Sequence, residues 1–213
     1  MMRKMLAKVA ICAVLLAPVV SAQSRNTVPD LRSIPELAYE FDKAVALGIP
    51  MAPLEAKARE GFLKGATAER VHVAVRNLSA KMVEAKEALA PVQSPNEILE
   101  GAKALQQGVP SSVLRAMRRT QRTRNLEVSL GVLTELVVRK IPMQRAADEV
   151  NKMLQRGVTE GVLIAFGRGV QGDISAGLAP TVALDIRSRG VLSLPQGPAQ
   201  GAALAPALRI PPP

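Results

Sequence analysis

Apolar residues recur at helical spacing along most of the chain. One stripe, at Leu54, Ala58 and Phe62, advances four residues at a time, so its members lie on one side of a helix. A longer stripe begins at Val71 and ends at Leu89. The predicted helices cover residues 31–47, 50–64, 67–89, 95–107, 110–124, 126–140, 142–156, 158–168 and 172–189.

A short phrase separates several of these segments. It reads GIP at residues 48–50, GVP at 108–110 and KIP at 140–142. Glycine just past a helix end can take the left-handed conformation that closes the helix, and proline suits the first turn of the next one because its missing N–H is not needed there. The phrase therefore predicts a corner between two helices, with Gly48 at positive φ, and it carries no chemistry of its own.

Other residues also mark helix boundaries. Ser33 with Glu36, and Ser94 with Glu97, have the spacing of a capping box, in which serine and glutamate satisfy the first free N–H groups of a helix. The dipeptide at 179–180, Ala-Pro, is expected to break the last predicted helix, because proline lacks the N–H that a helix interior needs.

These patterns predict an all-α protein. Helices that each carry one apolar stripe cannot bury it alone, so neighbours must stack. Short connections favour antiparallel hairpins, arranged either as a short solenoid or as an irregular closed bundle. The stretch 129–138 is rich in β-branched residues, but its flanking signals favour a helix over a strand.

The N-terminal segment has the organisation of a secretory signal peptide. Arg3, Lys4 and Lys8 precede an apolar run at 9–20, and small residues follow it up to Ala22. We expect cleavage after Ala22 and therefore an exported protein, periplasmic or extracellular, of bacterial type. A retained signal anchor is the alternative.

The remaining chain divides into three parts. Residues 23–30 are expected to form a flexible N-terminus, 31–190 a helical repeat domain, and 191–213 a tail rich in proline and alanine. Such a tail buries too little apolar surface to offset the entropy of ordering. The mature chain has no other apolar stretch long enough to span a membrane.

The segment 48–76, "GIPMAPLEAKAREGFLKGATAERVHVAVR", resembles uncharacterised exported bacterial proteins that share a repeated helix-corner motif of the GIP or GVP type. The likeness extends more loosely into the later units. Because no activity is known for that group, the resemblance implies an exported, bacterial and helical protein, and no mechanism.

The residue inventory argues against most enzyme chemistries. Cys12, the only cysteine, leaves with the signal peptide, and His72 is the only histidine. Neither a thiol nucleophile, a metal cluster nor a phosphate-binding loop is predicted, and we expect no cofactor and no metal. A non-enzymatic binding scaffold is the leading interpretation. The alternative is an envelope hydrolase whose carboxylates meet from distant helices.

The charge pattern supplies one candidate binding surface. The chain has a formal net charge of +10, and Arg115, Arg118, Arg119 and Arg122 have the spacing of one helix face. Guanidinium groups in a row suit an acidic protein or an anionic envelope polymer. A nucleic acid is not favoured, because aromatic residues for base stacking are scarce. An ordinary solvated helix face is the alternative interpretation.

The similarity between the helical segments of the chain adds a second observation about these arginines. When the segments that follow the corner phrases are aligned, Arg118 falls opposite Ala58 and Val150, and Arg122 likewise falls opposite apolar residues. A buried, unpaired arginine would be too unfavourable. We therefore expect the helix either to rotate its arginines outward or to face a groove.

Overall fold

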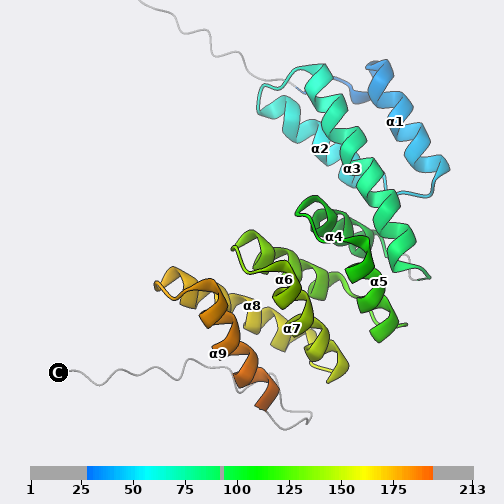
Figure 1. Ribbon diagram of the computed structural model, residues 1–213. Coiled ribbons are helices and arrows are strands. Elements are labelled where there is room, and N and C mark those ends of the chain that lie inside the picture. Colours follow the sequence, from blue (N-terminus) through cyan, green and yellow to red (C-terminus); the bar gives the residue numbers. More distant parts are fainter. Residues whose placement is uncertain (1–27, 92–93, 194–213) are drawn as a thin grey trace, which may run out of the picture.

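The computed structural model describes residues 28–91 and 94–193, where every regular element is a helix (Figure 1). The all-α class is thus confirmed. The predicted signal peptide and most of the predicted tail lie outside the described residues. The elements are η1 (Leu31–Ser33), α1 (Pro35–Ala46), α2 (Ala52–Leu63), α3 (Ala68–Leu89), α4 (Pro95–Gln106), α5 (Ser111–Thr120), α6 (Glu127–Val138), α7 (Met143–Gln155), α8 (Glu160–Ser175) and α9 (Pro180–Ser193).

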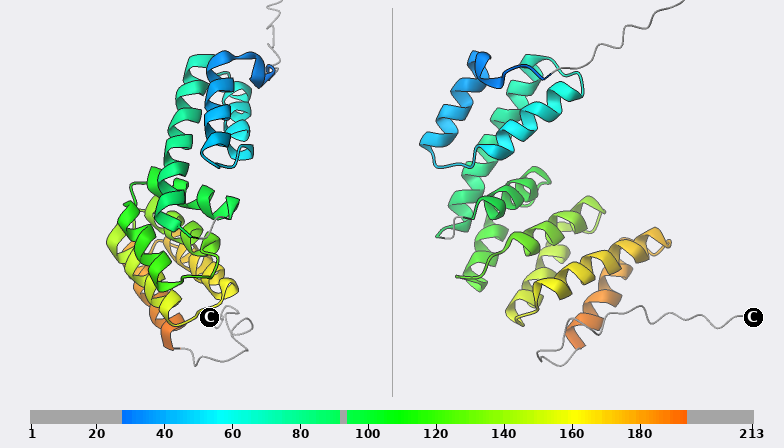
Figure 2. Two further views of the ribbon diagram at one scale, coloured as in Figure 1. Left: turned by 90° about the vertical axis from the view of Figure 1, so that its right-hand side faces the viewer. Right: turned by 180° about the vertical axis from the view of Figure 1, so that it is seen from behind.

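The long helix α3 joins two groups of helices. Helices α1 and α2 pack along one end of it, and α4 and α5 pack along the other (Figure 2). Beyond α3, the chain forms two rows: α4, α6 and α8 lie side by side in one, and α5, α7 and α9 in the other. This is the stacked-hairpin arrangement expected from the sequence. No helix in the described ranges has both the length and the apolar character that crossing a membrane would require.

The apolar stripes supply a continuous core. Gly101 on α4 shows how closely the helices pack, because a Cβ atom built there would lie 2.8 Å from Leu89 Cδ1 and 3.1 Å from Ala85 Cβ. Only glycine therefore lets α4 approach α3 at this point. Fully buried large side chains are Leu37, Phe41, Leu54, Met82, Leu89, Leu114, Met117, Leu126, Leu130, Leu133, Leu136 and Phe166.

The helix ends at the corners have the geometry that the GIP phrase predicts, but its prolines precede the next helix instead of lying in the first turn, since Pro110 and Pro142 are N-caps. Gly48 has a φ of 62°, its N–H bonds Val45 O at 2.9 Å, and the N–H of Ile49 bonds Ala44 O at 2.8 Å. These two bonds define a Schellman cap, and the buried Ile49 side chain packs back on the helix. The same pair of bonds closes the helices that end before Gly65, Gly108, Lys140, Gly157 and Gly177.

The boundaries of α8 and α9 differ from the sequence-based prediction. Helix α8 runs from Glu160 to Ser175 instead of ending at residue 168. The predicted helix 172–189 is interrupted before Pro180, as expected, and Pro180 begins α9. The predicted end at residue 168 falls between Gly167 and Gly169, but packing of α8 against α6 and α9 outweighs the weak helix propensity of these glycines. Helix α9 continues to Ser193, three residues past the predicted end of the domain.

Two further predictions are wrong. Helix α5 ends at Thr120, four residues early, and neither predicted capping box forms. Ile34 is the N-cap of α1, and Ser94 makes no side-chain cap bond to α4. Glu97, assigned to the second capping box, is fully buried instead. The early end of α5 and the burial of Glu97 have a common cause, described below.

Lys140 provides a test of the corner geometry, because it has a φ of 67° where five other corners have glycine. Lys140→Gly should raise the free energy of unfolding by up to about 1 kcal/mol, since glycine adopts this conformation without the Cβ clash. Gly48→Val should lower it by about 1 kcal/mol or more, because a β-branched residue disfavours positive φ. Urea denaturation of both variants measures the two shifts.

Lys140→Ala is the matched control. Alanine keeps the Cβ atom and so should give little of the gain. An equal gain for Lys140→Ala and Lys140→Gly would show that loss of the lysine side chain, and not relief of the backbone, accounts for the effect.

Candidate functional site

The four arginines predicted to share one exposed helix face do not do so. Arg115 and Arg119 are exposed on α5, and Arg122 is exposed but follows the end of that helix. Arg118 is 4% exposed and lies in the core. The predicted face is therefore wrong for Arg118 and, as a single helix face, for Arg122. That Arg115, Arg119 and Arg122 contact an anionic partner stays a prediction.

Arg118 joins the segments that meet around the start of α4. Its Nε donates to Leu89 O at 3.0 Å, and its Nη1 donates to Gln121 O at 2.8 Å and to Arg124 O at 2.9 Å. Its Nη2 donates to the carboxylate of Glu97. The side chain thus binds the end of α3, the start of α4 and the turn after α5. That turn supplies its carbonyls by leaving the helix at Thr120, which explains why α5 ends early.

Glu97 completes this buried pair. Its Oε1 also accepts the N–H of Leu126 at 3.2 Å, just before α6 begins, whereas its Oε2 has no hydrogen-bond partner. Burial lowers the pKa of Arg118, because loss of hydration disfavours the charged form. An ion pair with this degree of burial is a structural feature, since no solvent-side ligand can reach either group.

A shallow groove runs along the row of α4, α6 and α8. It encloses about 350 Å³, and its apolar surface includes Val128 and Val132. Carboxylates from two helices line it: Glu100 on α4, and Glu127 and Glu135 on α6. We call this hollow the acidic groove. The far wall is provided by Ile164 and Arg168 of α8.

The carboxylates of the acidic groove are only partly neutralised. Glu100 pairs with Lys103 at 2.7 Å, and Glu135 pairs with Arg139 at 3.3 Å, both within one helix. Glu127 accepts a hydrogen bond from the Asn96 side chain at 3.4 Å and forms no ion pair in the described structure. The lining of the groove thus carries three carboxylates and one guanidinium, that of Arg168, on a protein whose net charge is positive.

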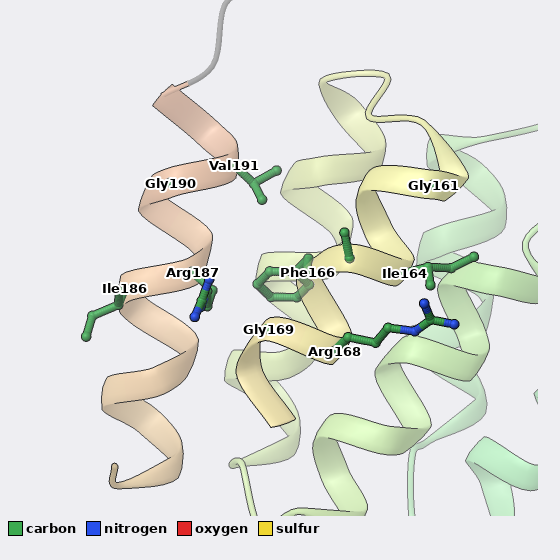
Figure 3. Close-up of a pocket in the computed structure, with 10 residues that line it drawn as sticks. Gly161, Ile164, Phe166, Arg168, Gly169, Ile186, Arg187, Gly190 and Val191 are labelled. Atoms are coloured by element: carbon green, nitrogen blue, oxygen red, sulfur yellow. The ribbon is translucent and has the colours of Figure 1, made fainter. Parts of the chain in front are cut away.

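A deeper cleft of about 590 Å³ lies between α8 and α9 (Figure 3). Phe166 and Arg187 lie between the two helices, and Gly161, Gly169 and Gly190 leave space along the walls (Figure 3). In the same view, Ile164 and Arg168 extend from α8 away from α9. Both residues line the cleft as well as the acidic groove, so they form a ridge between the two hollows.

The guanidinium of Arg187 is fixed by an ion pair across the α8–α9 hairpin. Its Nε and Nη2 donate to the two carboxylate oxygens of Asp173 at 2.7 and 2.6 Å. These bonds lower the pKa of Asp173 and raise that of Arg187. A Cβ atom at Gly169 would lie 3.1 Å from Arg187 Cδ, so glycine makes room for the arginine. Arg187 therefore closes the α8–α9 hairpin through Asp173, and its side chain remains 38% exposed.

A third hollow, of about 160 Å³, brings carboxylates together from two helices. Glu36 of α1 and Glu69 of α3 line it with His72. Behind it, Glu40 Oε1 lies 3.8 Å from His72 Nε2, and Glu40 Oε2 is buried without a partner. Among the described residues, no group of three or more histidine, cysteine and carboxylate side chains is arranged to hold a metal ion.

Sequence reasoning missed the acidic groove for a definable reason. Glu127 and Glu135 are eight residues apart, hence on similar sides of one helix, but the contribution of Glu100 depends on how α4 packs against α6. Only the fold brings these carboxylates and the apolar residues beneath them into one hollow.

The buried pair generates a stability prediction. Arg118→Gln should lower the free energy of unfolding by about 3–5 kcal/mol, because it leaves Glu97 buried and unpaired and frees three backbone carbonyls. Arg119→Gln, one residue away but exposed, should change it by less than about 0.5 kcal/mol. Urea denaturation of the two variants tests the difference, and equal midpoints would contradict the structural role of Arg118.

Comparisons with known proteins give no family to which the chain can be assigned. No family model, no curated protein and no solved structure matches it.

Proposed function

We propose that the protein is an exported, non-enzymatic helical repeat scaffold that binds a cationic segment of a partner protein in the acidic groove. Export is supported by the charged, apolar and small-residue order of residues 1–22. The observation that carries the binding site is the meeting of Glu100, Glu127 and Glu135 over an apolar surface on adjacent helices.

The groove suits a peptide better than a compact small molecule. Stacked helices present extended, shallow surfaces of this type to their partners. Val128 and Val132 can contact apolar side chains of a bound segment, while the carboxylates at the rim attract its lysine or arginine residues. Rim charges of this kind set selectivity and association rate more than affinity.

The surroundings of the carboxylates favour binding over catalysis. Glu100 and Glu135 are already paired with Lys103 and Arg139, and their pairs lie at the surface. Surface carboxylates in such pairs are suited to the electrostatic attraction of a cationic segment.

The proposal predicts charge-selective peptide binding. A short fluorescein-labelled peptide with leucine and lysine at helical spacing should bind, as measured by fluorescence anisotropy, and a matched leucine–glutamate peptide should not. The variant with Glu127→Lys and Glu135→Lys should bind the cationic peptide about tenfold or more weakly, which corresponds to about 1.4 kcal/mol. Binding should also weaken with added salt, because the rim is open to solvent.

A matched control separates the groove from general electrostatics. Glu87→Lys with Asp148→Lys makes the same charge change at exposed positions outside the groove. We expect this control to reduce binding by less than threefold, about 0.6 kcal/mol. Equal losses in the two double variants would contradict a groove-specific site.

The pocket of Glu36, Glu69 and His72 favours a second candidate function, that of an envelope hydrolase. The buried Glu40 faces His72, an arrangement that can orient an imidazole for proton transfer, and carboxylates from different helices do meet there. Release of dye from dye-labelled peptidoglycan measures hydrolysis. If the protein only binds, the full chain and its Glu69→Gln, His72→Gln double variant should release equal amounts of dye. Release that is lost in this variant would assign the hydrolase function instead.

A further inference from the structure

The exposed side of α8 carries an ordered set of three side chains. Glu160, Ile164 and Arg168 follow one another at four-residue intervals, so they lie in line along the helix. All three are exposed, and Ile164 is 38% exposed. Ile164 and Arg168 form the ridge between the acidic groove and the α8–α9 cleft, and Figure 3 shows them extending from the same side of α8.

Together with Glu160, these residues form the α8 ridge. Its two charges have no ion-pair partner within the described structure. Neither Glu160 nor Arg168 forms an ion pair there, although neighbouring positions do: Glu135 pairs with Arg139, and Arg187 with Asp173. Two turns of helix separate Glu160 from Arg168, about 12 Å at 1.5 Å per residue. They cannot satisfy each other within one chain.

The order of charges is self-complementary. If a second α8 lies antiparallel to the first with the two Ile164 side chains in contact, residue 160 of each copy comes opposite residue 168 of the other. Such an arrangement is a twofold, isologous contact, in which the same surface serves both partners. It would form two acid–base pairs on either side of an apolar centre.

Packing within the chain also leaves a space for this approach. A Cβ atom at Gly161 would meet nothing within 4 Å, so no internal contact requires glycine at this exposed helix position. Glycine in a helix interior is unfavourable by about 1 kcal/mol relative to alanine. Because Gly161 has no side chain, another helix can approach closely beside the ridge. The hollows on both sides of the ridge can receive the partner's side chains.

We propose that this ridge is a self-association surface, at which a second copy of the chain docks through an antiparallel α8–α8 contact centred on Ile164. A second copy is favoured over another partner because the sequence of acid, apolar and basic groups is its own complement. The proposal does not depend on peptide binding. Docking would also draw Arg168 toward Glu160 of the second copy, removing the one cation from the wall of the acidic groove.

Charge reversal tests the proposal directly. Sedimentation velocity of the full chain over a range of concentrations should show a monomer–dimer equilibrium. Glu160→Arg and Arg168→Glu should each raise the dimer dissociation constant at least tenfold, because each places like charges together at both ends of the contact. An equimolar mixture of the two variants should dimerise again, since every opposed pair in the mixed dimer then has opposite signs.

Matched reversals at exposed positions off the ridge, Asp148→Arg and Arg76→Glu, should leave the dimer unchanged. Three results would overturn the proposal: a wild-type chain that remains monomeric at all concentrations, a dimer unaffected by the ridge reversals, or a mixture that stays monomeric. Circular dichroism of each variant checks that the helices are intact.

A cross-link supplies an independent test of the symmetry axis. Cys12 is the only cysteine, so a Cys12→Ser, Ile164→Cys chain has a single thiol. Under mild oxidation it should form a disulfide-linked dimer, because residues on a twofold axis approach their own copies within the range that a disulfide needs. Val182→Cys, an exposed apolar position on α9, is the control and should cross-link at least tenfold more slowly. Equal rates would place the contact elsewhere.

Discussion

The buried pair of Glu97 and Arg118 determines how the two ends of the molecule are joined. Its partners belong to the last residue of α3, the first turn of α4, the turn after α5 and the residue before α6. A guanidinium with five donors can satisfy several acceptors at one point, which no apolar side chain could do. The free carbonyls of an irregular turn can therefore be buried where α3 meets the hairpin stack. The acidic groove lies on α4 and α6, the two helices that begin beside this junction.

Sequence patterns predicted the helices and their corners well because both depend on local chemistry. The apolar stripes define which face of each helix is buried, and glycine followed by an apolar residue defines a Schellman end. The failures arose where long-range contacts outweigh local preference. Helix α8 continues through its internal glycines because α6 and α9 pack on it, and Glu97 leaves its predicted capping role because Arg118 needs its carboxylate.

The alignment of corner segments placed Arg118 correctly at a core position, yet the conclusion drawn from it was wrong. An unpaired arginine would indeed have to turn outward. The missing information was the partner: Glu97 lies 21 residues earlier, on another helix, and no spacing rule connects the two. The same limit applies to the acidic groove, since Glu100 joins Glu127 and Glu135 only after α4 and α6 have packed. Residue spacing can identify each of these residues, but it does not predict which of them come together from different helices.

Three arginines on this scaffold show how a partner decides the role of the same side chain. Arg118 meets a carboxylate from another helix in the core and becomes structural. Arg187 meets Asp173 across the α8–α9 hairpin and closes it. Arg168 has no such carboxylate within the described chain, and the acid in line with it, Glu160, is two turns away on its own helix. For two charges fixed at that separation on one rigid helix, an antiparallel contact with a second copy is a geometry that satisfies both with the same sequence. The net charge of the chain conceals this difference, because it counts all three arginines alike.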